Sequence, residues 1–568
     1  EAQGLYSKAE PLYLRSLEID EKILGPDRPD FALTLENLAS LYTERGLYSK
    51  AEPLLLRALR LQFNFIQRES PYLVLSDRQS FVDSIYSNDL FSAFADNWDT
   101  GTNLAMFARL NRQGLLEEIE QRQAQLSSLP GPQQDIANQL RAITQQLASV
   151  DLTTEQRQNL TPRKEELERE LYQLLPELEP RIVEIEDVAQ AIPNNAVLIE
   201  FQRYQPMWGE DKYLAFVLKQ NADLTLIELG PAAPLEDAIQ KALLITEQGL
   251  SGAEEAWQQV SDLVLTPLEE ATQGSTTWFI SPDAELNRVP FAALRSFDNN
   301  QFLAEAIDLR LLTTGRELID LATQSTTTNQ NPLVVANPNF DLNASSSLEI
   351  SANASQQRSG DLSSLTWRAL PGTEKEGVVI SQLIDADLLV EGQATALAVQ
   401  QQEAVKILHL ASHAYYLEDQ EEGENPLLRS GIVLAGANEP NASDLDDGYL
   451  TALEITKLDW DGTELVVISG CESGRGQIQS GEGVYGLKRA IAVAGSRSSL
   501  LSLWKVDDAA TAAFMESFYK RLIAGEGRAD ALAATQKEFR NHPTNQDWRH
   551  PYVWAAFQLS GDWKPIAF

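Results

Sequence analysis

Cysteine is almost absent from this chain, because Cys471 is the only one among 568 residues. A single thiol cannot form an internal disulfide, and it cannot build a zinc site from several thiolates. Whatever Cys471 does chemically, it therefore does as a lone thiol. A free cysteine behaves most often as a small buried hydrophobic residue. A place in the core is thus one interpretation of Cys471, and a reactive thiol is the other.

Positive charge and long apolar runs are scarce as well. Lys and Arg together number 45 against 83 Asp and Glu, which gives a net charge of −38. Such an acidic surface repels phosphate backbones and anionic lipid, so we expect no direct binding to nucleic acid or membrane, and basic partners are favoured. No apolar stretch approaches the ~20 residues that span a bilayer, and no signal-like segment opens the chain. These features predict a cytoplasmic protein, although scarce cysteine would also suit a secreted bacterial protein.

A segment near the amino end recurs with a period of 42 residues, as Gly4–Leu12 and again as Gly46–Leu54. Between the copies, Gly25-Pro26-Asp27 breaks one helix, and small alanines at fixed offsets allow adjacent helices to approach closely. The pattern resembles the long form of the tetratricopeptide repeat that kinesin light chains contain. We therefore expect a partial repeat region over residues 1–60.

The repeat region is short for its class, because only about one and a half repeats are present, too few to stack a stable solenoid. The chain also begins at Glu1, without a methionine and inside a helical pattern. We expect a fragment or a processed form in which further repeats precede Glu1. The repeats predict either a groove that binds a regulatory protein partner or an end cap that covers the next domain, and the sequence leaves both open.

The middle of the chain, residues 61–190, has apolar residues at three- and four-residue spacing beside charged faces, which predicts a long antiparallel helical hairpin. Leu129-Pro130-Gly131-Pro132 interrupts it, and its charge runs, such as residues 117–120, are expected to be solvated faces. Near Ala196 the period changes to that of strands. Residues 191–257 are expected to form a β-hairpin and a helix segment packed on the domain that follows.

From Thr276 onward, strands and helices alternate, which predicts an α/β domain over residues 258–568 with a mostly parallel sheet sandwiched by helices. The Ser/Asn/Gln-rich stretch 343–364 has no apolar period and is expected to be a loop or disordered. Trp554 and Phe557 are expected to fill the core. The expected strands are 197–201, 213–218, 224–227, 277–280, 333–335, 387–390, 407–410, 465–468 and 498–503, and the helices include 374–383, 394–404 and 483–494.

Histidine is also scarce, with four residues: His409, His413, His542 and His550. The first two are four residues apart, a spacing that could hold zinc on a helix, but the thermolysin-type motif needs Glu where Leu410 stands. The run around them is expected to be a strand, which would separate the two side chains by ~13 Å. We therefore expect no metal site, a hydrogen-bonded structural role for His409 inside the strand, and a place at its carboxyl end for His413.

Cys471 follows a similar strand. Leu465–Ile468 is apolar throughout, and Ser469-Gly470 and Ser473-Gly474 mark a tight turn at its carboxyl end. If this strand and that of His413 are neighbours, both side chains lie at the edge of the sheet where ligands and catalytic groups gather. The histidine could then take the proton of the thiol, and two backbone N–H groups could stabilise an oxyanion by ~3 kcal/mol each. The opposing interpretation is two unrelated core residues.

Six segments, in order along the chain, resemble those of the CHAT domain, a caspase-like module associated with tetratricopeptide repeats. The resemblance covers residues 258–562, and ordered matches are far more specific than any single motif. The amino-terminal repeat and the helical middle also resemble the usual companions of this domain. The matching segments are Leu370–Glu376, Ile407–His413, Ser469–Gly474, Gly481–Ala490, Ser502–Asp508 and His550–Phe557.

The resemblance implies a caspase-hemoglobinase fold and a cysteine endopeptidase that hydrolyses peptide bonds in protein or peptide substrates. Carried over to this chain, it implies His413 as the general base and Cys471 as the nucleophile, with an oxyanion hole formed by the backbone N–H groups of Ala414 and Cys471. We expect no cofactor. Gly481–Gly483 lacks the Gly-Lys-Ser/Thr ending of a phosphate loop and does not follow a predicted strand directly.

Departures from the family pattern concern the oxyanion hole and the substrate pocket. Ala414 replaces the usual Gly, which would cost strain if that position needs a positive φ, and Gly470 stands where Ala is common. Some relatives carry Asp two residues before the cysteine to bind a basic P1 side chain, where this chain has Ser469. Asp507 and Asp508 are the alternative carboxylates for binding Arg or Lys at P1, while N-capping of the helix that follows is the competing role for both.

Three functions stay open at this point. The first is a cysteine endopeptidase regulated through its repeat and helical region, which the intact His413 and Cys471 favour. The second is a non-catalytic interaction scaffold, which the altered residue at Ala414 keeps open. The third is a latent enzyme that acts only after a partner reshapes its site.

Overall fold

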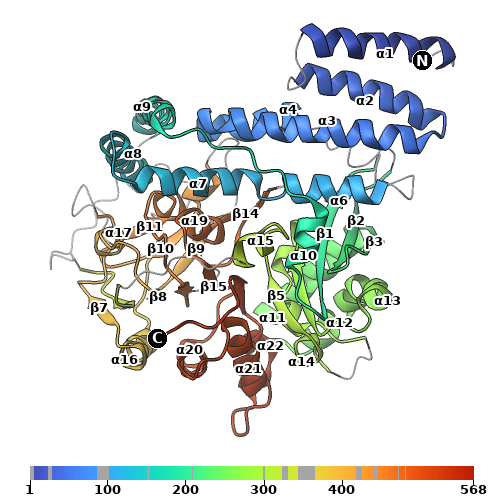
Figure 1. The fold of residues 1–568 in the computed structure, drawn as a ribbon. Coiled ribbons are helices and arrows are strands. Elements are labelled where there is room, and N and C mark those ends of the chain that lie inside the picture. The colour runs from blue at the N-terminus through green and yellow to red at the C-terminus, as the bar shows by residue number, and fades with distance from the viewer. Residues whose placement is uncertain are drawn as a thin grey trace.

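The computed structural model shows a stack of helices that lies along one side of an α/β body (Figure 1). The amino-terminal helices form the stack, and the carboxyl-terminal half of the chain forms most of the body. None of the described helices is both long and apolar enough to cross a bilayer. The structure describes residues 6–23, 29–85, 101–149, 152, 154–206, 209–297, 301–322, 330–342, 365–417, 425–438, 446–470, 473–479 and 482–568.

The first three helices, α1 (Tyr6–Ile23), α2 (Pro29–Glu44) and α3 (Tyr48–Glu69), pack one against the next. Each copy of the recurring segment places its tyrosine at the first residue of a helix, α1 or α3. Ala39 on α2 and Ala51 on α3 are fully buried in one hydrophobic cluster. Small side chains at these positions let the helices approach closely, as the repeat pattern predicts. The turn predicted between α1 and α2 lies outside the described residues.

Helices continue to residue 191 and confirm the helical middle. They are α4 (Leu75–Ile85), α6 (Gly101–Arg112), α7 (Leu115–Ser128), α8 (Gln133–Ala148), α9 (Thr154–Leu174) and α10 (Ile185–Ala191). The predicted hairpin corresponds to α8 and α9, which bury Leu140, Ile143, Leu167 and Leu171 in one cluster. It is shorter than predicted, because the break at 129–132 separates it from α7, and α6 and α7 lie along the α/β body (Figure 1).

The charge run on α7 is not a solvated face. Only 16% of the Glu117 side chain and 12% of the Glu120 side chain are exposed, and both carboxylates approach Arg489. They are covered because α7 packs on helix α19 (Leu487–Val493) of the α/β body. The expectation of a solvated run is therefore wrong here. Periodicity within one helix does not reveal that its charged face lies against another part of the chain.

One 11-stranded sheet runs through the α/β body. Its strands are β1 (Ala196–Tyr204), β2 (Lys212–Lys219), β3 (Leu224–Pro231), β4 (Thr277–Ser281), β5 (Asp308–Leu311), β6 (Leu333–Pro338), β7 (Asp387–Glu391), β8 (Ile407–Ala411), β12 (Leu465–Ile468), β15 (Ser498–Ser502) and β16 (Phe557–Gly561). Their order is β3-β2-β1-β4-β5-β16-β15-β12-β8-β6-β7. Only β1/β2, β2/β3 and β15/β16 are antiparallel among these described pairs, which confirms a mostly parallel sheet.

The central strands are apolar throughout because helices cover both faces of the sheet. In β12, Leu465 and Val467 belong to the core that also contains residues of α16 (Pro371–Ile384) and α20 (Asp508–Ile523). Val466 and Ile468, the other two residues of β12, belong to the core on the opposite face, which also contains residues of α19. Successive side chains of a strand point to opposite faces, so one short strand contributes to two hydrophobic cores.

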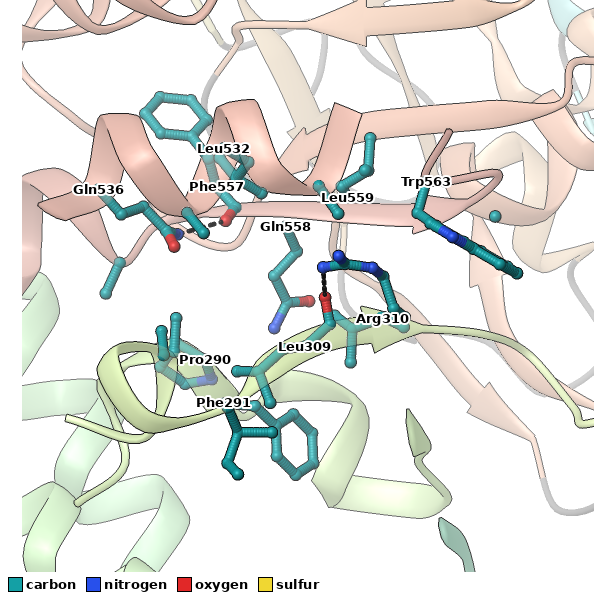
Figure 2. Close-up of a pocket in the computed structure, with 18 residues that line it drawn as sticks. Pro290, Phe291, Leu309, Arg310, Leu532, Gln536, Phe557, Gln558, Leu559 and Trp563 are labelled. Atoms are coloured by element: carbon teal, nitrogen blue, oxygen red, sulfur yellow. Dashed lines mark hydrogen bonds between the residues drawn. The ribbon is translucent and has the colours of Figure 1, made fainter. Parts of the chain in front are cut away.

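The sheet reverses direction between β15 and β16. In the described residues, β16 is joined to β5 at a single register position, Ser560 opposite Leu311. A small, mainly apolar pocket of about 50 Å³ lies beside this junction, between β5, β16 and helix α21 (Arg528–Arg540), as Figure 2 shows. Trp554 and Phe557 near it are buried, as expected.

The segment at residues 191–257 continues the sheet of the α/β body. β1 pairs in parallel with β4, and β2 and β3 extend the sheet beyond β1. The three strands predicted in this segment are confirmed. They join the following domain edge to edge, through backbone hydrogen bonds, and helices α11 (Ala232–Glu247) and α12 (Ala253–Val264) pack on that shared sheet.

Two smaller sheets lie beside the main one. One contains β9 (Ala414–Tyr416), β10 (Ser430–Val433) and β11 (Tyr449–Thr451), in the order β11-β10-β9. The other is the hairpin of β13 (Gly476–Gln479) and β14 (Gly483–Gly486). The sequence pattern predicts none of these strands, nor β5 and β16, because short strands with glycine and polar residues are specified by their partners rather than by local alternation.

Two predicted helices are shorter in the structure. The helix predicted at 483–494 begins only at Leu487, because β14 precedes it. Gly481, the first residue of the segment considered for a phosphate loop, lies outside the described residues, and the missing Gly-Lys-Ser/Thr ending stands. The helix predicted at 394–404 is only the short α17 (Ala396–Gln400). The loop predicted at 343–364 lies outside the described residues.

Candidate functional site

The strands that precede His413 and Cys471 lie side by side. β8 and β12 are parallel neighbours, with Leu410 opposite Ile468, which confirms the predicted arrangement. The N–H of Ser469 donates to the Leu410 carbonyl at 3.1 Å and extends the pairing beyond the end of β12. Both strands therefore end at the same edge of the sheet, where parallel sheets place ligands and reactive groups.

Gly470 packs directly against the segment that carries His413. A methyl group added to Gly470 would come within 2.5 Å of the Ser412 carbonyl oxygen and 2.9 Å of the Ala414 nitrogen. Only glycine permits so close an approach of two backbones. Cys471 and Glu472 lie outside the described residues, so the structure brings together His413 and the residue that precedes the cysteine.

Ser502 on β15 fastens the same turn from the other side. Its hydroxyl donates to the Gly470 carbonyl, and its N–H donates to the Ser473 hydroxyl, both at 2.9 Å. Its carbonyl accepts from the Gly474 N–H at 2.8 Å, and the Ser473 hydroxyl donates to the Ile468 carbonyl at 3.1 Å. Both serines are buried, so water does not compete for these bonds. The described Ser and Gly residues on both sides of positions 471–472 are therefore held by buried hydrogen bonds.

The imidazole of His413 lies between two aromatic rings and a backbone carbonyl. Its centroid is 5.3 Å from that of Phe340 and 5.1 Å from that of Trp367. Its Nε2 lies 2.9 Å from the carbonyl oxygen of Arg368. A carbonyl oxygen can only accept, so Nε2 carries the proton, and the neutral ring keeps Nδ1 as its unprotonated nitrogen. This arrangement lets Nδ1 act as a base.

The electrostatic surroundings of His413 favour the neutral ring. Burial lowers the pKa of His413 below its ordinary value, and the hydrogen bond to the Arg368 carbonyl opposes that shift. The positive charge of Lys505 lowers the pKa further, while Asp508 raises it. Because desolvation disfavours the charged imidazolium, the ring is able to accept a proton at neutral pH.

His409 has a structural role, as predicted. It is fully buried on β8, with Nε2 2.9 Å from Oε1 of Glu376 and Nδ1 3.1 Å from the hydroxyl of Tyr519. The carboxylate accepts from Nε2–H and the tyrosine donates to Nδ1, so both ring nitrogens are satisfied. This contact also explains Glu376 within the motif on α16. No group of three or more His, Cys, Asp or Glu side chains in the described residues is arranged to hold a metal ion.

Ala414 presents a backbone N–H that the small sheet does not use. The N–H of Val433 donates to the His413 carbonyl, so these two residues form a hydrogen-bonded pair of the β9/β10 ladder. The next pair, which contains Ala414, is then not hydrogen-bonded, and its N–H points away from β10. Gly470 packs on that nitrogen. Ala414 is not among the residues with positive φ, so the strain considered for alanine at this position does not arise.

Asp507 serves as the N-cap of α20. Its Oδ1 accepts hydrogen bonds from the N–H groups of Ala509 and Ala510, both at 3.1 Å. Capping by Asp satisfies helix N–H groups that otherwise lack partners. The carboxylate of Asp507 is therefore already engaged in the role that competes with substrate binding.

Asp508 and Ser469, unlike Asp507, have no capping role among the described hydrogen bonds. Burial, and after it the charge of Asp507, raises the pKa of the half-buried Asp508 carboxyl, and His413 opposes the rise. The two groups therefore share one electrostatic environment. The hydroxyl oxygen of Ser469 is buried and has no hydrogen-bond partner within the described part of the chain.

Several contacts of His413 have no signature in the sequence. Arg368 acts through its backbone carbonyl, which every residue possesses. Phe340 and Trp367 belong to segments with no helix or strand pattern, on either side of the Ser/Asn/Gln-rich stretch. The only available signal is a tryptophan three residues before the motif that begins at Leu370. Long-range packing, rather than local pattern, brings these groups to the histidine.

Comparison with known families covers most of the chain. A model of the CHAT domain matches residues 254–562, and a model of the tetratricopeptide repeat matches residues 1–62. With the mostly parallel sheet, these matches describe a caspase-like α/β domain preceded by a helical repeat region.

Curated relatives are much longer than this chain. Tetratricopeptide repeat protein 28 of Homo sapiens is 26% identical over 333 residues, which are 53% of this chain and 13% of that protein. The Mus musculus protein of the same name is 24% identical over 379 residues, 60% of this chain and 14% of that protein. The chain thus spans 13–14% of the length of these relatives.

Solved structures show only a distant likeness. The separase–securin complex of Saccharomyces cerevisiae has a TM-score of 0.41 and 10% identity, covering 91% of this chain and 38% of that chain. The Arg-specific cysteine proteinase gingipain R has a TM-score of 0.32 and 10% identity, covering 59% of this chain and 75% of that chain.

The environment of His413 predicts a titration below the ordinary histidine range. In a Cys471→Ala variant, where no thiol couples to the ring, NMR should report a pKa for His413 below ~6.5. The neutral ring then stabilises the fold fully above ~6.5, and this contribution is lost as the pH falls through the lower folded value. His413→Ala identifies the signal and should remove this part of the pH dependence of unfolding. A pKa at or above the ordinary value would contradict the burial of the ring.

Proposed function

Because the chain belongs to the CHAT domain family, we propose that it is a cysteine endopeptidase that hydrolyses peptide bonds with His413 and Cys471. One observation supports this more than any other. β8 and β12 pair in parallel, and Gly470 packs against the residues on both sides of His413. A nucleophile directly after Gly470 and a base at His413 then act at the same edge of the sheet.

The proposed reaction uses the unprotonated Nδ1 of His413. Nδ1 takes the proton of the Cys471 thiol, and the thiolate attacks the carbonyl carbon of the scissile peptide bond. The N–H groups of Ala414 and Cys471 donate to the oxyanion of the tetrahedral intermediate. The imidazolium then gives its proton to the leaving amine, and the C–N bond breaks to leave a thioester. Water, deprotonated by the same imidazole, hydrolyses the thioester and restores the thiol.

The dyad is tested by substitution of each member. Cys471→Ala and His413→Ala should each abolish cleavage of arginyl, lysyl and aspartyl peptide reporters, and Cys471→Ala should also abolish labelling by a thiol-directed acyl probe. His409→Ala is not a matched control, because it empties a buried network, so Asn541→Ala on the exposed end of α21 serves instead. Labelling and cleavage that persist in both dyad variants would overturn the assignment. A wild-type protein that never cleaves, with or without partners, would favour the interaction scaffold.

Substrate preference for Arg or Lys at P1 is the finer part of the proposal. Asp508 is the better candidate of the two aspartates, because the Asp507 carboxylate caps α20. Asp508 is half-buried and electrostatically coupled to His413, so it lies near the proposed reaction. The unpartnered hydroxyl of Ser469 would contribute a further polar contact to the same pocket. A buried carboxylate attracts a cationic side chain and repels an anionic one.

The pocket proposal predicts a selective effect. Asp508→Asn should lower kcat/KM for arginyl and lysyl reporters about 10- to 100-fold, the loss of one hydrogen bond to a charged group, and leave uncharged reporters unchanged. Asp507→Asn is the matched control, because Asn caps helices as well as Asp does, and it should change neither. Equal losses on every reporter would remove Asp508 from the pocket.

Regulation through the helical region has a physical route. Arg112 on α6 and Arg489 on α19 both pair with Glu482, which is fully buried and precedes β14. Arg489 also pairs with Glu120 on α7 at 3.0 Å. The β13/β14 hairpin follows the turn of Cys471 in sequence, so a partner that shifts α6 and α7 would reach that turn through these ion pairs. Breaking one partner of a buried pair exposes the other to an unfavourable environment.

Loss of this link should loosen the hairpin. Arg112→Ala should lower the free energy of unfolding by about 1–3 kcal/mol, increase hydrogen exchange in residues 476–486, and lower kcat. Arg163→Ala removes an exposed ion pair with Glu166 on α9 and should change stability by less than ~1 kcal/mol, with the hairpin unaffected. Unchanged hairpin exchange in Arg112→Ala would exclude this route of regulation.

A further inference from the structure

Asn438 holds the backbone of Trp367 with two hydrogen bonds. Its Oδ1 accepts from the Trp367 N–H, and its Nδ2 donates to the Trp367 carbonyl, both at 2.8 Å. Nδ2 also donates to Oδ1 of Asp341 at 2.7 Å, which orients the amide. The side chain thus pairs with the main chain as a strand would, in a segment, residues 365–370, that has no helix or strand of its own.

The same tryptophan is held at a second point. Its Nε1–H donates to the hydroxyl of Tyr449 at 2.9 Å, and that hydroxyl donates to the Ala437 carbonyl at 3.2 Å. Tyr449 is buried on β11, and Ala437 immediately precedes Asn438. Both tethers of Trp367 therefore come from β11 and from residues that follow β10.

The tethered residue directly precedes the one that contacts His413. The Arg368 carbonyl lies 2.9 Å from Nε2 of His413, and the Trp367 ring packs beside the imidazole. The Arg368 side chain is exposed, so its carbonyl is positioned by the backbone and not by packing of its own side chain. The place of that carbonyl depends on the tethers of the preceding residue.

We propose that Asn438 is a positioning residue for the peptidase reaction: by holding the backbone of Trp367, it sets the Arg368 carbonyl against Nε2 and keeps Nδ1 of His413 unprotonated. This inference rests on the proposed function for its meaning in catalysis. Asn is suited to the task because its amide offers one acceptor and two donors in one plane. Asp at this position would lose both donated bonds and would face the carboxylate of Asp341.

The first test measures the tautomer and needs no activity. With ¹⁵N-labelled histidine, the chain gives four imidazole signals, and His413→Ala identifies the relevant one. Wild type should show His413 protonated at Nε2. Asn438→Ala should shift it toward a mixture of the two tautomers and lower its pKa further, because the carbonyl that favours the protonated ring is no longer held in place. An unchanged His413 tautomer in a folded Asn438→Ala protein would overturn the proposal.

The second test measures kinetics on a reporter that the wild type cleaves. Asn438→Ala should lower kcat about 10- to 100-fold, which is the cost of misplacing a catalytic group by roughly an ångström, and should change KM by less than about twofold. KM changes little because the proposed role of Asn438 includes no contact with substrate. The acid limb of the pH profile should shift with the pKa of His413. A fall in substrate affinity alone, with kcat unchanged, would contradict the positioning role.

Gln67→Ala is the matched control. Gln67 on α3 holds the backbone of Arg181 in the same way, accepting from its N–H at 2.7 Å and donating to its carbonyl at 3.1 Å. Gln67 is buried, whereas Asn438 is half-buried, so the loss of Gln67 is the more severe test of a general effect of destabilisation. Its loss should reduce stability and leave the tautomer of His413 and kcat unchanged. An equal change of tautomer in Gln67→Ala would show a general effect of destabilisation and would refute the specific role of Asn438.

Tyr449→Phe keeps the proposal testable if Asn438→Ala does not fold. It removes only the second tether of Trp367, and it should move the tautomer of His413 in the same direction to a smaller extent. A folded Tyr449→Phe protein with an unchanged tautomer would count against the tethers. If the wild type cleaves nothing, the proposed function fails, while the tautomer measurement still decides whether Asn438 positions the ring.

Discussion

The parallel pairing of β8 with β12 is the constraint on which the candidate site depends. Apart from His409, both strands are apolar on both faces, so burial of apolar side chains alone does not select one register over its neighbours. His409 supplies the missing information. Its imidazole must face Glu376 and Tyr519, where both ring nitrogens find partners, and a slip by one residue would place it unsatisfied in the opposite core. A buried polar network thus fixes the strand that presents His413.

The turn around Cys471 depends on the same pairing and explains the residue types beside the cysteine. Gly470 has no side chain because the Ser412–Ala414 backbone occupies the space that one would need. The Ser473 hydroxyl donates to the Ile468 carbonyl and accepts from the Ser502 N–H, and the Ser502 hydroxyl donates to the Gly470 carbonyl. The packing at these positions requires small residues that can hydrogen-bond to the backbone. The Gly and Ser residues are therefore a recognisable pattern in the sequence.

The sequence reveals the parts of the site that local pattern specifies, and it does not reveal the parts that long-range packing brings together. The apolar runs predict β8 and β12, and the Ser and Gly residues predict where β12 ends, because local pattern specifies both. The contacts of His413 are not visible, because they are a backbone carbonyl from Arg368, two aromatic rings and an amide from Asn438, all contributed by segments without periodicity. The buried face of α7 is equally hidden, since its glutamates resemble those of any solvated helix.

The two halves of the proposed dyad are supported by different parts of the molecule. His413 is held within the α/β domain, by Arg368 and the small sheet that carries Tyr449. The hairpin beyond the cysteine is held from the helical region as well, because Glu482 pairs with Arg112 of α6 in addition to Arg489 of α19. In the proposed regulation, a partner bound to the helices would act on the hairpin that follows the cysteine, through the ion pair of Arg112 with Glu482. Proton transfer and attack both need a spacing correct to within about an ångström, so the proposed regulation requires only a small shift of the hairpin relative to His413.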